Sequence, residues 1–513
     1  MNNNRLLYHL IGSLSKAEKR YVSRYAAFNR DKSRLLKLFN FINEHGITSD
    51  EDLRKSNKNA TLLRDIEVSK VHLTQLILVS LRQYHRQEGG ERRLRGLMDD
   101  ADILWRKSQY QACAQTLKKV KRLAKSLGYY TYVLEAAYME RNMMGTHPAF
   151  PLTEETIDIA NREEKEALEA LQTEFKFRNL AARSAIIHKR FGNSRSETDF
   201  AEITALAAMP EYDVSEATTL RSKRFYHHSM LTYYSSIGNL ERAVMHNREI
   251  LETYNAPELI REHAAGFIIA HNNQALLHLR LKQYKSALEI LEALPLQLKS
   301  AIRRPNRELQ WRVQVARLNY SLGICLECGD MHRAKPLILE AEDFIARFAR
   351  TISVMRLSEM RFSIASYYLI NNQPDKALEY LSAVEQTDYV RQKHDLYISV
   401  RIMQLIAHYE LGNTLLLPYL VRSLYHAVMS RERLFRFESV LIGFMRKDLL
   451  KIVDKRSAQR SFKKLHATFE VLYNDPLEQH AFINFDILSW LDSKIRNISF
   501  TQAIYEKHGH LLV

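Results

Sequence analysis

The sequence predicts an all-α protein, and three observations lead to this fold class. The 513-residue chain contains only 15 Gly and 10 Pro, fewer than a strand-rich fold with many tight turns requires. Good helix formers such as Leu, Ala, Glu, Lys and Arg dominate the composition. A pattern of two amphipathic helices joined by a short break also recurs along the chain.

The recurring unit is clearest at residues 233–255, "YYSSIGNLERAVMHNREILETYN", where one helix stops at Gly238-Asn239 and a second begins. Other segments superpose on it when the break and the small residue that opens the second helix are aligned. The aligned break residues are Ser108, Gly238, Lys282, Gly329, Asn372 and Gly412. The residues at the second position are Cys113, Ala243, Ala287, Ala334, Ala377 and, in the weakest copy, Leu417.

From Ala243 onward the spacings between these positions are 44, 47, 43 and 40 residues. The 130 residues between Cys113 and Ala243 have room for three more units of similar length. A period in this range predicts a solenoid, in which each helix pair buries its apolar face against the next pair. We therefore expect Ala243, Ala287, Ala334 and Ala377 to be buried where paired helices cross.

These residues resemble the tetratricopeptide-repeat superfamily. An aromatic residue or His ends the first helix, Gly or Asn follows at the turn, and a large and a small residue come at fixed offsets. The resemblance covers residues 95–425 at most and is strongest over 222–420. The period here is 40–47 rather than about 34 residues, and the aromatic-Leu-Gly opening of the first helix is missing. The whole arrangement is also similar to helical proteins of bacteria, a likeness that implies no activity.

The tetratricopeptide-like resemblance implies a right-handed superhelical array of antiparallel helix pairs, with a concave groove lined by the first helix of each pair. A peptide or a partner helix fits such a groove. Carried over by position, the groove residues are His228, Thr232 and Ser235, then Asn272, Leu276 and Leu279, then Asn319, Gly323 and Leu326. Asn272 and Asn319 occupy equivalent positions, and their amides are suited to bind a peptide backbone.

Residues 1–90 are expected to form a separate helical module. Ser15 and Glu18 have the spacing of a capping box, which predicts a helix starting at Lys16. A second helix is expected around residues 35–42, a short third helix capped by Ser49 or Asp50, and a long apolar helix over 62–85. The segment "QEGGERR" at 87–93 reads as a linker. A helical repeat array over 91–425 and a capping region over 426–513 complete the predicted organisation.

The charge of the chain is concentrated at its ends. The net charge is +16, and residues 1–125 carry 26 Lys and Arg against 13 Asp and Glu. Lys16, Lys19, Arg20 and Arg24 alternate with Tyr21, Tyr25 and Phe28, a pattern able to contact phosphates. The alternative is a solvated basic helix, because no helix-turn-helix signature accompanies these residues.

No motif predicts catalysis, so we expect a protein that is not an enzyme and that needs no cofactor. Cys325-x-x-Cys328 has neither the further ligands of a zinc site nor the βαβ context of a redox motif, so both thiols are expected to be structural. His227 and His228 are adjacent and leave a helix in different directions, which prevents them from sharing a metal.

Three cysteines, the lack of a signal peptide and the lack of an apolar span favour a cytoplasmic protein that does not contact membranes. The favoured interpretation is a non-catalytic scaffold that binds a protein or peptide partner. The alternative is a regulator whose basic N-terminal module binds nucleic acid while the array senses a partner.

Overall fold

The protein is helical throughout the part of the chain that the structure describes. This structure, a computed structural model, describes residues 3–27, 33–56, 65–86, 89–191, 196–207, 213–349, 352–392, 394–413, 415–429, 435–447 and 455–512. These residues form helices and no strand, apart from one isolated bridge between His147 and Phe150. The predicted all-α class is therefore confirmed. The chain divides into two compact units, Met1–Leu168 and Glu169–Val513.

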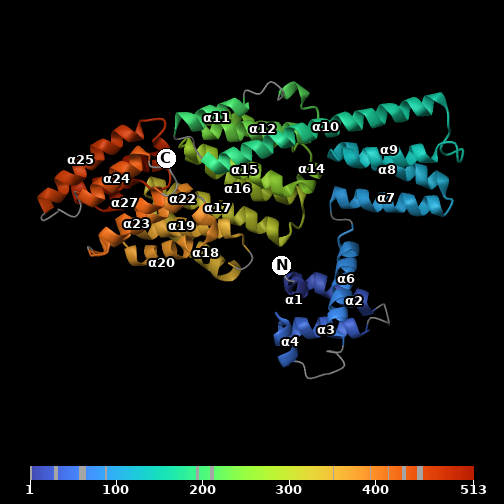
Figure 1. The fold of residues 1–513 in the computed structure, drawn as a ribbon, viewed down its shortest axis with the longest axis horizontal. Coiled ribbons are helices and arrows are strands. Elements are labelled where there is room, and N and C mark those ends of the chain that lie inside the picture. The colour runs from blue at the N-terminus through green and yellow to red at the C-terminus, as the bar shows by residue number, and fades with distance from the viewer. Residues whose placement is uncertain are drawn as a thin grey trace. The chain divides into compact units, whose positions relative to one another are not determined.

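The first unit contains two groups of helices, each with its own core. Its helices are α1 (Asn3–Ser13), α2 (Lys16–Ala27), α3 (Ser33–His45), α4 (Asp50–Ser56), α6 (Ile66–Tyr84), α7 (Gly90–Arg106), α8 (Tyr110–Leu127), α9 (Tyr130–Met143) and the first part of α10 (Glu154–Phe191) (Figure 1). Helices α1 to α6 bury a core that includes Leu7, Val22, Phe39 and Ile77. Helices α7 to α10 bury a second core around Leu117.

The predicted start of α2 is confirmed at the level of single atoms. The helix begins at Lys16, and the Ser15 N–H donates to the Glu18 carboxylate at 2.7 Å. The Glu18 N–H donates to Ser15 Oγ at 3.3 Å, which completes the capping box. Ser49 Oγ likewise accepts from the Asp52 N–H at 3.1 Å and caps α4.

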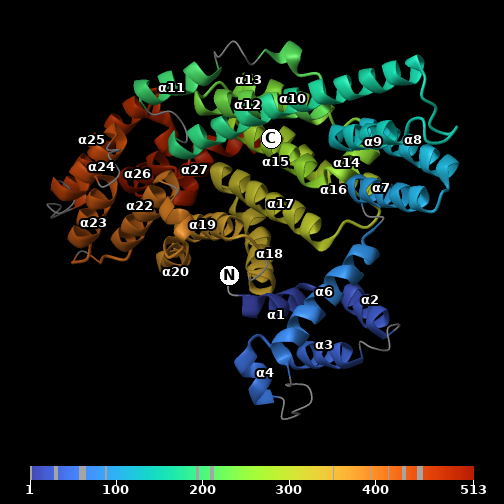
Figure 2. The same ribbon diagram turned by 45° about the vertical axis from the view of Figure 1, so that its right-hand side comes forward.

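The second unit contains the remaining helices. They are the rest of α10, α11 (Glu197–Ala207), η3 (Val214–Glu216), α12 (Leu220–Ser236), α13 (Leu240–Glu252), α14 (Pro257–Glu262), α15 (Ala264–Arg280), α16 (Tyr284–Ala301), α17 (Arg307–Cys328), α18 (Met331–Phe348), α19 (Val354–Ile370), α20 (Pro374–Glu385), α21 (Asp388–Gln392), α22 (His394–Glu410), α23 (Leu417–Met429), α24 (Arg436–Lys447), α25 (Lys455–Tyr473), η5 (Gln479–Phe482), α26 (Ile487–Arg496), α27 (Phe500–His508) and η6 (Gly509–Leu512). Sequential helices α12–α13, α15–α16, α17–α18 and α19–α20 pack as pairs (Figure 2).

All six aligned break residues adopt the same backbone conformation. Ser108, Lys282 and Asn372 have φ of 55°, 58° and 57°, and Gly238, Gly329 and Gly412 have φ of 79°, 71° and 70°. In each turn the N–H of the next residue donates to the carbonyl five residues back, over 2.8–3.0 Å. This is the left-handed helix stop of a Schellman motif, so the alignment located six copies of one turn.

The small residue after each turn is buried, as expected. Ala243, Ala287, Ala334 and Ala377 are each 0% exposed, and Cys113 at the equivalent place is also 0% exposed. A side chain of one or two heavy atoms leaves room for the preceding helix to approach closely. The predicted burial of these four alanines is therefore confirmed.

Two features differ from the expected organisation. Gly90 to Arg93 belong to α7 rather than to a linker, and Gly89, whose φ is 88°, directly precedes this helix. Gln87 and Glu88, the first residues of the predicted linker, lie outside the described residues. The interval between Cys113 and Ala243 holds α9, the 38-residue α10 and α11 in place of three hairpins of similar length. The expected divisions of the chain near residues 90 and 425 stay predictions.

The C-terminal helices lie along the turns of the helix pairs. Thr501 Oγ1 in α27 donates to the carbonyl of Ile370 at 3.2 Å, beside the α19–α20 turn. Trp490 Nε1 in α26 donates to the Glu410 carboxylate at 2.7 Å, beside the turn after α22. Gly329, in the α17–α18 turn, faces the backbone of Tyr505. Residues 487–512 thus contact three successive turns and hold them together.

Candidate partner-binding face of the first helices

The shared turn defines equivalent positions on α12, α15 and α17. The reference residue is the one whose carbonyl accepts the long hydrogen bond across the turn, namely Tyr234, His278 or Cys325. Six residues before it stand His228, Asn272 and Asn319; two residues before it stand Thr232, Leu276 and Gly323; directly after it stand Ser235, Leu279 and Leu326. The expected groove residues therefore do occupy equivalent places in three helices.

Helix α12 leaves its three expected groove residues accessible. His228 is exposed, and Thr232 and Ser235 are partly exposed. They follow one another at spacings of four and three residues, so they lie on one side of the helix. Thr232 Oγ1 donates to the His228 carbonyl at 2.9 Å, which occupies its proton but leaves its lone pairs available.

Helix α15 presents an apolar stripe. Leu276 is 38% exposed, and Ile269, seven residues earlier on the same side, is also 38% exposed. Leu279 belongs instead to a buried cluster with Tyr284 and Ala287, so a partner could reach it only if the helix pair opened. In α17, Leu326 is partly buried against the main core.

Asn272 is buried, whereas the equivalent Asn319 is partly exposed. Asn272 is only 5% exposed. The Oδ1 atoms of both Asn272 and Asn319 are buried and have no hydrogen-bond partner among the described residues. An unpaired buried acceptor typically costs about 1–3 kcal/mol. Contact between either amide and a bound peptide would therefore require the side chain to rotate outward.

A chain of polar contacts next to Asn272, buried at one end and exposed at the other, was not expected from the sequence. Asn247 Nδ2, from α13, donates to Gln274 Oε1 at 2.6 Å and to the Ala270 carbonyl at 2.9 Å. Gln274 Nε2 lies 3.0 Å from His278 Nε2, and His278 Nδ1 lies 2.6 Å from Gln283 Oε1. These contacts fit the arrangement in which Gln274 donates to His278 Nε2 and His278 Nδ1 donates to Gln283. The chain links α13 to α15 and to the following turn.

An aromatic and histidine cluster fills the space between α12 and α13. His227 Nδ1 lies 3.0 Å from His246 Nδ1, so one of these nitrogens donates a hydrogen bond to the other. His246 stacks on Tyr234 with ring centroids 5.3 Å apart. Burial, together with His227 and Arg242, lowers the pKa of His246 to about 4. The expected divergence of His227 and His228 is observed: the first enters this cluster and the second faces outward.

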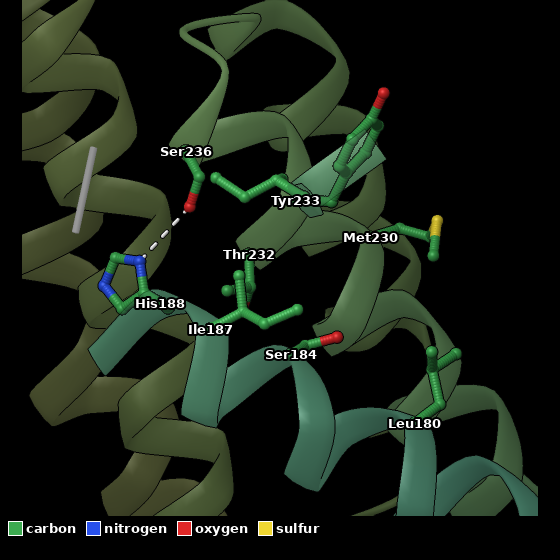
Figure 3. A pocket seen from close by; sticks show the side chains of 9 residues that line it. Leu180, Ser184, Ile187, His188, Met230, Thr232, Tyr233 and Ser236 are labelled. Carbon is green, nitrogen blue, oxygen red and sulfur yellow. Dashed lines mark hydrogen bonds between the residues drawn. The ribbon is translucent and has the colours of Figure 1, made fainter. Parts of the chain in front are cut away.

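A small pocket lies between α10, α11 and α12, on the side of α12 that carries Thr232. Its enclosed volume is about 10 Å³, roughly what one water molecule needs. His188 Nδ1 lies 3.2 Å from Ser236 Oγ and closes one end of it (Figure 3). The lining residues are Leu180, Ser184, Ile187, His188, Ile203, Met230, Thr232, Tyr233 and Ser236.

Cys325 and Cys328 lie in the last turn of α17, and both side chains are buried. Burial raises the pKa of Cys325 to about 11 and that of Cys328 to about 12. Both groups therefore remain protonated near neutral pH, and neither is a reactive thiolate. In the described part of the chain, no group of three or more His, Cys, Asp or Glu side chains is arranged to hold a metal ion.

The basic residues of the first module lie on α2. Lys16, Arg20 and Arg24 are exposed and stand four residues apart, which places them on one side of the helix. Lys19 is partly buried. Tyr21 contacts Tyr84 of α6, with ring centroids 5.1 Å apart, so this aromatic residue packs within the module. Phe28 lies outside the described residues.

The described helices include none with the combined length and apolar character that a bilayer span requires. Comparison of the chain with protein-family models, with curated proteins and with solved structures gave no match.

Proposed function

We propose that this protein is a non-catalytic scaffold that binds a protein or peptide partner along the first helices of its helix pairs. The observation that supports this proposal is the accessible face of α12 and α15. His228, Thr232 and Ser235 form a polar stripe on α12, and Ile269 and Leu276 form an apolar stripe on α15. A polar stripe and an apolar stripe on the first helices of two successive pairs suit an amphipathic helix or an extended segment.

The test is site-specific photocrosslinking in a lysate of the native cell. A photoreactive amino acid at Leu276 is expected to capture a discrete partner, because this side chain lies on the proposed face. The matched control carries the same amino acid at Met245, which is 63% exposed on the second helix α13. Excess unlabelled wild-type protein should abolish the Leu276 product.

Specificity is tested by competition with variants. An excess of the Leu276→Arg variant should compete at least about tenfold less well than wild type, because a charge replaces the apolar contact. The Met245→Arg variant should compete as well as wild type. Equal competition by both variants, or the same product from both crosslinking positions, would exclude the first-helix face as the binding surface.

A second function, binding of nucleic acid by the first module, is supported by the side of α2 that carries Lys16, Arg20 and Arg24. These three cations form no ion pair with other described residues, so they are available to neutralise phosphates. The partner-sensing array of this alternative would use the same face of α12 and α15.

A gel shift with random duplex DNA at about 50 mM and 200 mM salt tests this second function. The triple change Lys16→Glu, Arg20→Glu, Arg24→Glu should abolish binding. The matched control is Lys118→Glu, Lys119→Glu, Arg122→Glu on α8, which changes the net charge equally at three exposed positions. No shift with wild-type protein at the lower salt, or equal loss in both variants, would exclude a site on α2.

A further inference from the structure

Helix α6 has an apolar side that no other described residue covers. Val68 is 55% exposed, Val71 is 59% exposed, and Leu78 is 46% exposed. With Gln75 and Arg82, which are also exposed, these residues follow at spacings of three, four, three and four. We call this set, Val68, Val71, Gln75, Leu78 and Arg82, the α6 stripe. Such spacing marks the seam of a two-helix coiled coil.

The opposite side of α6 is already occupied. Leu73, Leu76 and Ile77 belong to the core of the first module, where α6 packs on α1, α2 and α3. Helix α6 is therefore held by its inner side while its outer side presents valine and leucine to solvent. Exposed apolar side chains that gather on one side of a helix mark interaction surfaces.

We propose that the α6 stripe binds the α6 stripe of a second copy of this chain, with the two helices antiparallel. Gln75 lies at the centre of the stripe, with Val71 on one side of it and Leu78 on the other, and Val68 and Arg82 form the two ends. An antiparallel partner centred there places Val71 against Leu78 and Val79 of the other copy, so that apolar residues meet apolar residues. The two Gln75 amides then face each other, and each can donate to and accept from the other. A single polar pair in an apolar seam fixes its register.

The charges at the ends of the stripe favour this orientation. Glu67 stands at one end with its side chain 62% exposed, and Arg82 stands at the other. In the antiparallel arrangement Glu67 of each copy lies beside Arg82 of its partner, which gives two attractive pairs. A parallel arrangement would bring Arg82 against Arg82. Glu67 also contacts Lys70 Nζ at 2.8 Å within its own helix.

The length of the helix sets the expected strength of the dimer. The 19 residues of α6 span about 28 Å, so the contact is smaller than a standard interface of about 800 Å² per partner. We therefore expect a dimer that dissociates in the micromolar range. This surface is separate from the first-helix face, so the dimer does not depend on the function proposed above.

Sedimentation equilibrium of the full chain between about 1 and 100 μM tests the dimer. Wild-type protein should move from monomer to dimer over this range. Val71→Asp and Leu78→Asp should each weaken the dimer at least about tenfold, because each buries a carboxylate in the seam. The matched control is Val471→Asp on α25, where the valine is 64% exposed, and it should leave the dimer unchanged. A wild-type monomer at 100 μM, or dimers insensitive to both stripe variants, would overturn the proposal.

Charge reversal and crosslinking test the antiparallel register. Glu67→Arg and Arg82→Glu should each weaken the dimer, whereas the double variant should restore it. Gln75→Cys should form a disulfide-linked dimer on oxidation, because the two Gln75 positions face each other. The three native cysteines are buried and should not interfere. Val68→Cys should not link to itself but should link to Arg82→Cys in a mixture. Self-linking of Val68→Cys, or failure of the double charge variant to restore the dimer, would overturn the antiparallel arrangement.

Discussion

Gly329 and Tyr505 are packed backbone to backbone. A Cβ atom built on Gly329 would lie 2.8 Å from the Tyr505 nitrogen and 3.0 Å from its Cα atom. Gly329 also has φ of 71°, a conformation that side chains disfavour. The α17–α18 turn therefore favours glycine for two separate reasons. One is the backbone conformation of Gly329 itself, and the other is the close approach of α27.

A pair of glycine substitutions separates these two reasons. Gly412 has nearly the same φ, 70°, but no atom lies within 4 Å of its built Cβ. Gly412→Ala should cost about 1 kcal/mol of unfolding free energy from backbone strain alone. Gly329→Ala should cost about 1–3 kcal/mol more, because α27 must shift. Urea denaturation measures both values, and equal losses would show that α27 does not press on this turn.

The crossing of paired helices can be tested at Ala287. Ala287→Arg should lower the unfolding free energy by several kcal/mol, about 3 or more, because a charge enters a closed helix contact. Glu289→Arg introduces arginine at an exposed position two residues later on the same helix and should change the unfolding free energy by less than about 0.5 kcal/mol. Thermal and urea unfolding compare the two. Wild-type stability of the Ala287 variant would contradict the close crossing at this position.

Lys282 offers a stabilising change. It occupies the turn with φ of 58°, where its Cβ is strained and a glycine would not be. The gain from relieved strain exceeds the added freedom of the unfolded chain, so Lys282→Gly should stabilise the protein by about 0.5 kcal/mol. Glu289→Gly, at an exposed position inside α16, should instead destabilise it by about 1 kcal/mol. Losses of stability in both variants would argue against the left-handed turn at Lys282.

The histidine cluster predicts a loss of stability in mild acid. His246 has a pKa of about 4 in the folded protein, below its ordinary value of 6.5. Above pH 6.5 the group is neutral in both states and has no effect. Between pH 6.5 and 4 the unfolded chain binds the proton more readily, so stability falls by about 1–3 kcal/mol, and below pH 4 this loss stops growing.

His246→Phe keeps an aromatic ring against Tyr234 but removes the titrating group. The unfolding free energy of wild type and of the variant is measured at pH 7.5 and at pH 5. The loss between the two pH values in wild type, minus the loss in the variant, gives the contribution of His246. The variant should lose less stability on acidification than wild type. An equal loss in both proteins would mean that other groups cause the acid sensitivity.

The sequence was sufficient to predict the local features of the fold. Turn residues such as Gly238 and Asn372, the small residues after them, and the Ser15–Glu18 capping box all act within about ten residues of chain. Patterns at that range reflect backbone preferences and packing limits that a sequence displays directly. The length of α10 was not predicted. We expected regular helix pairs in this interval, although the helical pattern there continues without a strong stop signal.

Long-range contacts could not be predicted in the same way. Nothing near Thr501 or Trp490 indicates that these residues meet Ile370 and Glu410, because such contacts depend on how all the intervening helices stack. The same limit applies to the candidate face: the turn alignment found the equivalent positions of Asn272 and Asn319. It could not tell that the Asn272 side chain points inward, because the neighbouring helices decide which side is covered.

The return of the C-terminal helices onto the turns sets an order of events during synthesis. Thr501 contacts Ile370 across 131 residues of chain. At about 5–20 residues per second, the ribosome takes roughly 7 to 26 seconds to add those residues. Throughout that time the helix pairs from α17 to α20 lack their contacts with α26 and α27. The turns that these two helices later cover are then accessible to chaperones and proteases. Chains stalled before Ile487 should therefore be cut at these turns, and the released full-length chain should resist.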